Sequence, residues 1–426
     1  MKNVIILAYD FPPNNSMGSL RPYAWYKYFH EFNLHPVVIT RHWDDSVKSF
    51  KDGIKPSKSK SITINTTSEG TIINVPHEPN FRDKLILKYG LNSFVIFRKI
   101  ISVFYLIFEY TFFKFDNKKG IYYAADEYIK EHGADLIIAT GEPFILFRYA
   151  SKLSKKHSIP WIADYRDYWS MDINLLTFNQ KIIYKLIYAH FERKFVESAS
   201  LITTVSPLNM KLQKEFFPNK KVEIIYNGYF EEKDYNFTKN DPISETFTVA
   251  YGGTIYLFNP LENFIEGVKL FIEKDPSRKC SFNFYGSNYD PDQKERIIKC
   301  TKGLERFIIL TDKLSKEELF LEYKKASCLL IFNYNQMIPG KLFEYLPMKR
   351  KILMAGNDHG PIESIINNTN SGIICDSPEN IANTLDSMYL EWKSTGLLKN
   401  EAINIEKYTR RNQTQNLAKL IHKQLT

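Results

Sequence analysis

The regular alternation of short apolar runs with longer helix-like runs is the feature that most constrains the fold of this chain. Such alternation predicts parallel sheets whose strands are joined by helices on both faces. The expected strands are 2–9, 36–40, 135–140, 160–165, 201–205, 222–226, 247–251, 281–285, 307–310, 328–332, 351–354 and 372–375. The first expected helix is 20–32 and the last spans about 408–425.

A charged, turn-rich stretch at 229–245, YFEEKDYNFTKNDPISE, separates two rounds of this alternation and is the best candidate for a linker. It divides the chain into a first domain, 1–228, and a second domain, 246–407. The chain has 426 residues, of which 44% are hydrophobic, and this is enough for two cores. The expected fold class is α/β, with two doubly wound parallel sheets in succession.

Four cysteines, none of them in a C-x-x-C pair, argue against a disulfide scaffold and against a zinc site. Reduced thiols in a reducing compartment are the expectation. The opening MKNVIILAYDFPP has a short apolar run and no small-residue cleavage site, so we expect a buried strand and not a signal peptide. A membrane span needs roughly 18 uninterrupted apolar residues. The sequence has no such run, so we expect no membrane span.

The net charge of +9 is concentrated in residues 48–119, which hold 13 basic and 6 acidic residues. No nucleic-acid reading module accompanies them, so an anionic membrane surface or a phosphate-bearing substrate is the expected partner. Within this region, 81–115 interleaves large apolar residues with cations that include Arg98 and Lys99. An interfacial amphipathic helix that contacts the membrane through these two residues explains the pattern. A helix packed on the sheet explains it equally well.

Two motifs in the first half follow expected strands. In FPPNNSMGSLRPY, Gly18 would let the backbone approach a phosphate or a sugar, although an ordinary glycine at a helix start is the simpler reading. In PWIADYRDYW, the side chains of Asp164, Arg166 and Asp167 cluster at a strand end. They are able to hold hydroxyl groups of a ligand or to form an internal ion pair.

Two motifs in the second half of the chain also follow expected strands. YGGTIYLFN opens the second sheet, and the amide of Gly253 suits a phosphate cradle or a tight turn. QMIPGKLFEYL places Lys341 and Glu344 three residues apart on one helix face. A lysine at a helix N-terminus opposes the helix dipole, so an anion beside it is expected. A carboxylate one turn away suits the vicinal diol of a ribose.

The order and spacing of these motifs resemble the GT-B-fold glycosyltransferases of family 4. The similarity also rests on DLIIATGEPF, ERKFVESASLITTVS, IIYNG and the closing YTRRNQTQNLAKLI. The resemblance implies two Rossmann-like domains that face a central cleft, with the closing segment 408–426 packed back on the first domain. It also implies a nucleotide-sugar donor, retention of anomeric configuration and no metal cofactor.

Carried over by position, the resemblance gives each residue a role. Glu344 binds the donor ribose, and Lys341 lies beside the diphosphate with Gly340 at the helix start. Arg166 and Asp167 stand near the acceptor, on the same side as Asp164. Further donor contacts fall on Gly18, Gly253, Thr254 and Gln336.

Several positions depart from the family pattern. Gln336 stands where many relatives have a first glutamate, while Thr254 and Asn259 replace an arginine and a lysine. The cationic clamp on the diphosphate is therefore reduced, which leaves Lys341 and Arg21 to supply it. Arg166 replaces a histidine.

The function expected from this resemblance is sugar transfer from a nucleotide diphosphate sugar to a hydroxyl of a glycan, with the acceptor carried on a lipid. The setting would be surface polysaccharide or glycoprotein glycan assembly, at the cytoplasmic face of the membrane. Two alternatives stay open: a nucleotide-sugar epimerase on the same fold, and an inactive GT-B module that only binds.

Overall fold

A computed structural model describes residues 1–45, 47, 49–171, 178–231, 245–288 and 290–426 of the chain. These residues form two units, each with its own sheet. Unit 1 comprises Met1–Tyr226 and Arg410–Thr426, and unit 2 comprises Asn227–Thr409. Most of the expected linker, residues 232–244, lies outside the described residues.

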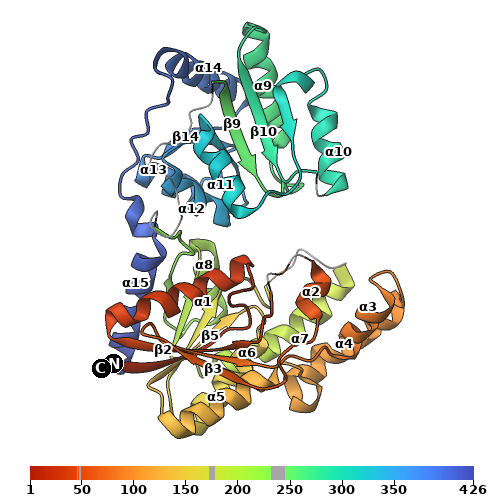
Figure 1. Ribbon diagram of the computed structural model, residues 1–426, viewed down its shortest axis with the longest axis vertical. Helices are drawn as coiled ribbons and strands as arrows, with labels where there is room; N and C mark the ends of the chain where they lie inside the picture. Colours follow the sequence, from red (N-terminus) through yellow and green to blue (C-terminus); the bar gives the residue numbers. More distant parts are fainter. Residues whose placement is uncertain (46, 48, 172–177, 232–244, 289) are drawn as a thin grey trace. The chain divides into compact units, whose positions relative to one another are not determined.

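The sheet of unit 1 runs in the order β3-β4-β2-β1-β5-β6-β7-β8 within the described part of the chain. Figure 1 labels β2, β3 and β5 of this sheet. All neighbouring pairs are parallel except β3 with β4. On β1, Ile5 is paired with Val37 on one side and with Ile137 on the other. The strands are β1 (Lys2–Leu7), β2 (Leu34–Arg41), β3 (Thr63–Thr66), β4 (Thr71–Val75), β5 (Leu136–Gly141), β6 (Trp161–Tyr165), β7 (Leu201–Thr204) and β8 (Val222–Ile224).

Both faces of this sheet are covered, because alternate residues of each strand point to opposite sides. On one face the core joins Ile6 to Trp25 of α1 and to Leu417 of α15. On the other face it joins Ile5 to α5, α6 and α7 through residues such as Ala125 and Phe147. The helices are α1 (Met17–Tyr28), α2 (Phe50–Ile54), α3 (Phe81–Tyr89), α4 (Val95–Thr111), α5 (Lys119–His132), α6 (Ile145–His157), α7 (Phe178–Val196), α8 (Pro207–Phe216) and α15 (Arg410–Leu425).

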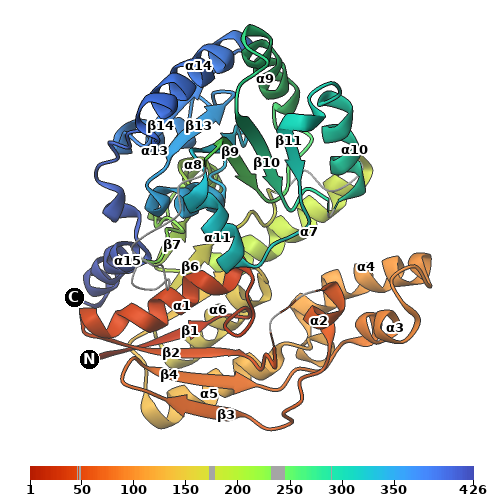
Figure 2. The same cartoon turned by 45° about the horizontal axis from the view of Figure 1, so that its top comes forward.

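The segment 81–115 forms two helices, α3 and α4, where the sequence suggested one. They are separated at Gly90 and Phe94, whose φ angles of 88° and 52° are incompatible with a continuous right-handed helix. Figures 1 and 2 both show α3 and α4 side by side at one end of unit 1, with α2 next to them.

Unit 2 is a parallel sheet with strand order β11-β10-β9-β12-β13-β14 in the described residues. Phe264 of α9 packs edge-on against Phe282 and Phe332 of the sheet, and Gly267 of α9 lets Ile381 of α14 approach closely. The elements are β9 (Phe247–Gly252), α9 (Leu261–Lys274), β10 (Cys280–Tyr285), α10 (Pro291–Cys300), β11 (Ile308–Leu310), α11 (Lys316–Lys325), β12 (Cys328–Phe332), α12 (Gly340–Tyr345), β13 (Lys351–Ala355), α13 (Pro361–Thr369), β14 (Gly372–Cys375) and α14 (Pro378–Thr395).

The expectation of two doubly wound parallel sheets is confirmed, with each expected strand within a few residues of an observed one. The antiparallel pair β3–β4 was not expected. All four cysteines are free thiols. In the described part of the chain, no helix combines the length and the apolar character that crossing a membrane requires.

Candidate functional site

The carboxyl ends of the strands in unit 2 bring several loops of the candidate site together. Gly253 follows β9, Gly286 follows β10 and Lys313 follows β11. A Cβ atom placed on Gly286 would lie 3.9 Å from the Cα atoms of both Gly253 and Lys313, so these three loops are in close contact. In open parallel sheets, ligands bind at this edge of the sheet. The sequence did not single out Gly286 or Lys313.

Lys341, on the first turn of α12, reaches over β9 into this group of loops. Its ammonium donates a hydrogen bond of 2.6 Å to Tyr251 Oη and lies 3.9 Å from the centroid of that ring. Burial lowers the pKa of Lys341 to about 7, and the nearby Glu344 carboxylate only partly opposes this effect. A hydroxyl does not neutralise the ammonium, so an anion placed here would be stabilised by it.

Gly253 leaves the space beside that ammonium open. It is exposed and has a φ of 95°, a conformation that favours glycine. A Cβ there would lie 3.6 Å from Lys341 Nζ. Thr254 follows as an exposed residue, and its carbonyl accepts a hydrogen bond from Tyr251 Oη. The structure therefore brings Gly253, Thr254 and Lys341 together, as the motifs suggested.

Glu344 lies one turn after Lys341 on α12, which begins at Gly340. Its side chain is 19% exposed, and Lys316 Nζ lies 3.9 Å from its Oε1 atom. The carboxylate is thus accessible and only loosely paired, as a ligand for hydroxyl groups must be. Lys316, at the start of α11, is a second cation of this edge that the sequence did not reveal.

Gln336 has a local structural role. Its φ is 69°, its amide nitrogen donates to the Asp358 carbonyl, and its side chain fills the space over Gly360. The expected donor contact through its amide therefore requires a rearrangement of this loop. Asn259 is likewise buried, where it bridges the Asn333 carbonyl and the Tyr256 amide.

Arg296 is a cation beside the β9–α9 loop that sequence reasoning missed. Its guanidinium donates to the carbonyls of Tyr256 and Asn259, at 2.9 Å each, and it forms a 2.6 Å ion pair with Glu262. Its charge is therefore used to hold the loop. It does not restore the cationic clamp that Thr254 and Asn259 lack.

In unit 1, Asp164 is enclosed and does not face a ligand. Its carboxylate has no exposed surface and accepts hydrogen bonds from Arg21, Thr140 and Thr203. Arg21 is 2% exposed and also donates to the Ile225 carbonyl at 2.6 Å. The expectations of an acceptor contact at Asp164 and of a diphosphate contact at Arg21 are corrected accordingly, because each group neutralises the other inside the fold.

Arg166, Gly18 and Asp10 form a second group at the carboxyl ends of β1 and β6. Arg166 donates to the carbonyls of Gly141 and Glu142, and its Nη2 atom lies 3.8 Å from Asp10. A Cβ on Gly18 would lie 2.1 Å from Arg166 Nη1. A side chain at position 18 would therefore collide with the Arg166 guanidinium. We expected Gly18 to make room for a phosphate or sugar, but in this structure it makes room for Arg166.

Asp10 is the residue of this group that the sequence did not reveal, although it lies in the loop after β1, three residues beyond Leu7. Burial raises the pKa of its carboxyl, against the lowering effect of the Arg166 and Arg41 guanidiniums. Asp167 is exposed beside this group.

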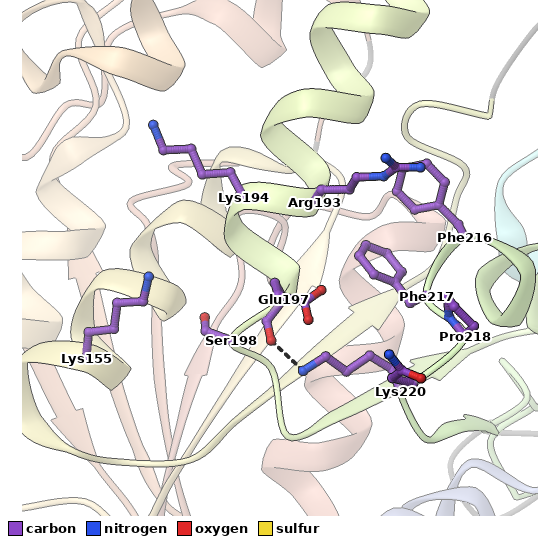
Figure 3. Close-up of a pocket in the computed structure, with 10 residues that line it drawn as sticks. Lys155, Arg193, Lys194, Glu197, Ser198, Phe216, Phe217, Pro218 and Lys220 are labelled. Atoms are coloured by element: carbon purple, nitrogen blue, oxygen red, sulfur yellow. Dashed lines mark hydrogen bonds between the residues drawn. The ribbon is translucent and has the colours of Figure 1, made fainter.

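The cavity of about 640 Å³ drawn in Figure 3 contains none of the predicted site residues. Four cations line it where α6, α7 and α8 end: Lys155, Arg193, Lys194 and Lys220. The Lys220 ammonium donates to the carbonyls of Glu197 and Ala199. Cations at helix C-termini stabilise the helix dipoles, so this cluster has a structural explanation.

The two predicted membrane contacts differ from each other. Lys99 is exposed on α4, whereas the Arg98 guanidinium folds back to donate to the carbonyls of Leu91 and Ser93. Among the described residues, no group of three or more His, Cys, Asp or Glu side chains is arranged to hold a metal.

No protein-family model matches the chain, and no curated protein matches it. Solved structures share its fold over its full length. HepE (Alr3699) of Anabaena, in complex with UDP, has a TM-score of 0.59 at 10% identity, covering 99% of this chain and 100% of that one. A glycosyltransferase from Rickettsia africae has a TM-score of 0.55 at 13% identity, covering 100% and 97%.

A third solved structure, a putative UDP-N-acetylglucosamine 2-epimerase from Listeria monocytogenes, has a TM-score of 0.51 at 11% identity, covering 100% and 98%. These likenesses show the fold alone. The chain has the GT-B fold.

Proposed function

We propose that the protein is a retaining glycosyltransferase of the family 4 type that uses a nucleotide diphosphate sugar. The observation that carries the proposal is Lys341, a buried ammonium bonded to a hydroxyl and placed beside the open Gly253 backbone. The solved structures of similar fold support it, because one is a complex with UDP and another is a glycosyltransferase.

In this proposal the donor binds along the carboxyl edge of the unit 2 sheet. Glu344 accepts hydrogen bonds from both ribose hydroxyls, since its carboxylate is accessible and loosely paired. The diphosphate lies against Lys341 and the amides of Gly253 and Thr254. Its negative charge raises the pKa of Lys341 from about 7, so the lysine is fully protonated in the complex.

The reaction proceeds on one face of the sugar. The bond between the anomeric carbon and the diphosphate oxygen breaks, and the acceptor hydroxyl bonds to the anomeric carbon from the same side. The hydroxyl proton passes to the departing diphosphate. Lys341 stabilises the charge that develops on this leaving group, which is electrostatic catalysis and requires no metal.

Arg166 and Asp167 act on the acceptor side in this proposal. The Arg166 guanidinium is held by two carbonyls and by Asp10, which fixes its direction. Asp167 is exposed beside it and accepts a hydrogen bond from an acceptor hydroxyl.

We further propose that the acceptor is lipid-linked and that the protein docks on an anionic membrane through α3 and α4. Six exposed apolar side chains of α4 form one stripe: Ile96, Phe97, Ile100, Val103, Phe104 and Ile107. The two acidic residues of 81–115, Asp83 and Glu109, are instead paired with Arg82 and Lys118. The outer surface is therefore apolar and cationic, as an anionic bilayer requires.

A thermal-shift screen of nucleoside diphosphates and nucleotide sugars tests the donor proposal. A ligand that binds the native state alone raises stability by RT ln(1 + [L]/Kd), so the correct base stands out. The shift should disappear in Glu344→Ala. Incubation with the nucleotide sugar alone distinguishes an epimerase from a glycosyltransferase. An epimerase converts the sugar without an acceptor, and a transferase does not. No shift with any nucleotide would contradict both.

A further inference from the structure

The strand β3, at one edge of the sheet of unit 1, leaves half of its backbone groups without a strand partner. Among the described strands it pairs with β4 alone, and Figure 2 shows it beyond β4 at the edge of the sheet. At the turn between them the Thr67 amide donates to the Gly70 carbonyl, which fixes the bonded pairs of this antiparallel ladder. Bonded and non-bonded pairs alternate along such a ladder. Ile62, Ile64 and Thr66 therefore direct their amides and carbonyls away from β4.

The composition of β3 is unusual for an exposed edge strand. Edge strands commonly avoid pairing with another molecule through charged side chains, prolines or bulges. Residues 61–66, SITINT, contain no charge and no proline, and four of the six are β-branched, which favours strand pairing. The register of β3 with β4 contains no bulge. The other edge strand of the sheet, β8, is protected, because it is three residues long, contains Glu223 and directly follows Lys221.

The residues of β3 with outward backbone groups also face an open cavity with their side chains. Ile62, Ile64 and Thr66 line this cavity, of about 550 Å³, together with Ile73 of β4 and residues of α5. The side chains of Ile62 and Ile64 remain 44% and 66% exposed. A strand added to this edge would bond to the backbone of β3 and would cover these apolar side chains at the same time.

The two ends of β3 carry opposite charge. Lys60 precedes the strand, and Glu69 lies in the turn that follows it. The helix α5 adds to the acidic end. A Cβ on Gly120 would lie 3.3 Å from the last residue of β4, so α5 begins there and its later residues lie beside the start of β4 and the end of β3. Among these later residues, Glu127 and Glu131 are exposed and line the cavity.

This polarity favours a second copy of β3, in antiparallel direction, as the added strand. In such a pair the basic start of each strand lies against the acidic end of the other, whereas a parallel pair would bring like charges together. All three outward residues of each copy find partners when Ile64 lies opposite Ile64 of the second copy and Ile62 lies opposite Thr66. Lys60 of each copy then lies beside the turn that contains Glu69 of the other.

We propose that the protein forms a two-fold dimer in which the sheets of two copies join edge to edge through β3. A two-fold contact uses the same patch on both copies, and the charge pattern of this edge is complementary to itself. The contact is short, so the dissociation constant of the dimer should lie in the micromolar range. This dimer does not depend on the proposed function, because none of the residues assigned to the donor or the acceptor takes part in it.

Sedimentation velocity on the full chain, over the micromolar range of concentration, tests this proposal. The wild type should pass from monomer to dimer as its concentration rises. Ile64→Lys places two ammonium groups opposite each other at the two-fold axis and should weaken the dimer by at least about tenfold. Because Ile64 is exposed, the variant should keep the wild-type melting temperature. Ile309→Lys is the matched control, since Ile309 is an exposed isoleucine of β11, the edge strand of unit 2, and it should dimerise like the wild type.

Charge reversal tests the antiparallel direction of the pair. Lys60→Glu brings like charges together at both ends of the contact and should weaken the dimer by about fivefold. Adding Glu69→Lys to the same chain restores opposite charges and should recover most of this loss. Within its own copy Lys60 forms an exposed ion pair with Glu78, and loss of that pair alone would not be reversed by the second change. Failure of the double variant to recover would contradict the antiparallel pairing.

Three further outcomes would overturn the dimer. A monomer at every concentration would leave this edge to a strand of a different protein. A dimer that Ile64→Lys does not weaken would have its contact elsewhere. Hydrogen exchange at the amides of Ile62, Ile64 and Thr66 should slow as the concentration rises, and unchanged rates would show that these groups stay open. Ile64→Lys should give the same shifts as the wild type in the nucleotide screen, so failure of the donor proposal would be seen separately.

Discussion

Two buried cations, Arg21 in unit 1 and Lys341 in unit 2, show how differently the units use charge. Both stand near the start of a helix that follows a strand, and both were expected to contact the diphosphate. Arg21 forms a 2.6 Å ion pair with the fully buried Asp164. Lys341 instead donates to the Tyr251 hydroxyl. The first cation is used to hold the fold, while the second has no carboxylate within ion-pair distance in the described residues, and under the proposed function its charge serves a ligand.

Energetics support this distinction. A buried ion pair is expensive to break, because the remaining partner is left as an uncompensated charge. A buried ammonium without a carboxylate is destabilised, and its pKa falls, here to about 7. A cation that lowers stability and lies beside an exposed glycine, as Lys341 does, is a better candidate for ligand binding than a cation that is fully paired, as Arg21 is.

The largest effect that we predict is on the stability of unit 1. Asp164→Ala leaves the Arg21 guanidinium buried without its partner and should lower the free energy of unfolding by about 3–5 kcal/mol. Urea unfolding followed by tryptophan fluorescence measures it, since Trp25 and Trp161 are core residues of this unit. Lys341→Met is the matched change in unit 2 and should cost less than about 1 kcal/mol. Equal losses of unfolding free energy in Asp164→Ala and Lys341→Met would show that both cations are used to hold the fold.

The next effect is on nucleotide affinity. Glu344→Ala removes a charged acceptor from the ribose and should weaken binding by about 1.5–3 kcal/mol, roughly ten- to over a hundredfold. Calorimetry with the nucleotide selected in the thermal-shift screen measures it, and the variant should melt at the wild-type temperature without ligand. Glu363→Ala, on α13, serves as a control. Normal nucleotide binding by Glu344→Ala would show that α12 is only structural.

The sequence predicted the strands better than it predicted the roles of side chains. Buried parallel strands are continuous apolar runs, so β1, β5 and β12 were recognisable. The β3–β4 pair was missed because Thr63–Thr66 is exposed throughout and has no apolar periodicity. The sequence did place Lys341 and Glu344 on one helix, and both lie on α12, because residues three apart share a helix face.

Contacts between distant residues were not predictable in this way. Arg21 and Asp164 are 143 residues apart, and nothing local shows that they neutralise each other.

The third prediction uses pH to test whether the Lys341 charge is held for a ligand. UDP-glucose keeps the same charge near neutral pH because both of its phosphates are esterified. Its affinity should be constant below pH 7, where Lys341 is protonated, and should fall by up to tenfold per pH unit above it. Lys341→Arg stays charged and should flatten this profile. The same slope in both proteins would mean that another group titrates.

The same lysine gives a stability effect of known sign. Its folded pKa of about 7 lies below the ordinary value of 10.5. Between these values the unfolded chain binds more protons, so this residue makes stability rise with pH from about 7 to about 10.5. Lys341→Met should remove that part of the rise, which is checked by urea unfolding across the window.

The smallest effect that we predict is on membrane binding by two neighbouring cations of α4. As with Arg21 and Lys341, one of them is bonded within the protein and the other is not. Arg98 is bound to the carbonyls of its own loop, whereas Lys99 is exposed. Lys99→Gln should weaken binding to phosphatidylglycerol-containing vesicles by about 1 kcal/mol, roughly fivefold, and added salt should erase the difference. Vesicle flotation measures this, with phosphatidylcholine vesicles as the control.

Arg98→Gln should instead lower the melting temperature, because it frees the loop between α3 and α4. Much of its effect on flotation should remain when salt is added. If both variants float like the wild type, the charged part of the membrane proposal fails, and docking would have to rest on the apolar stripe alone.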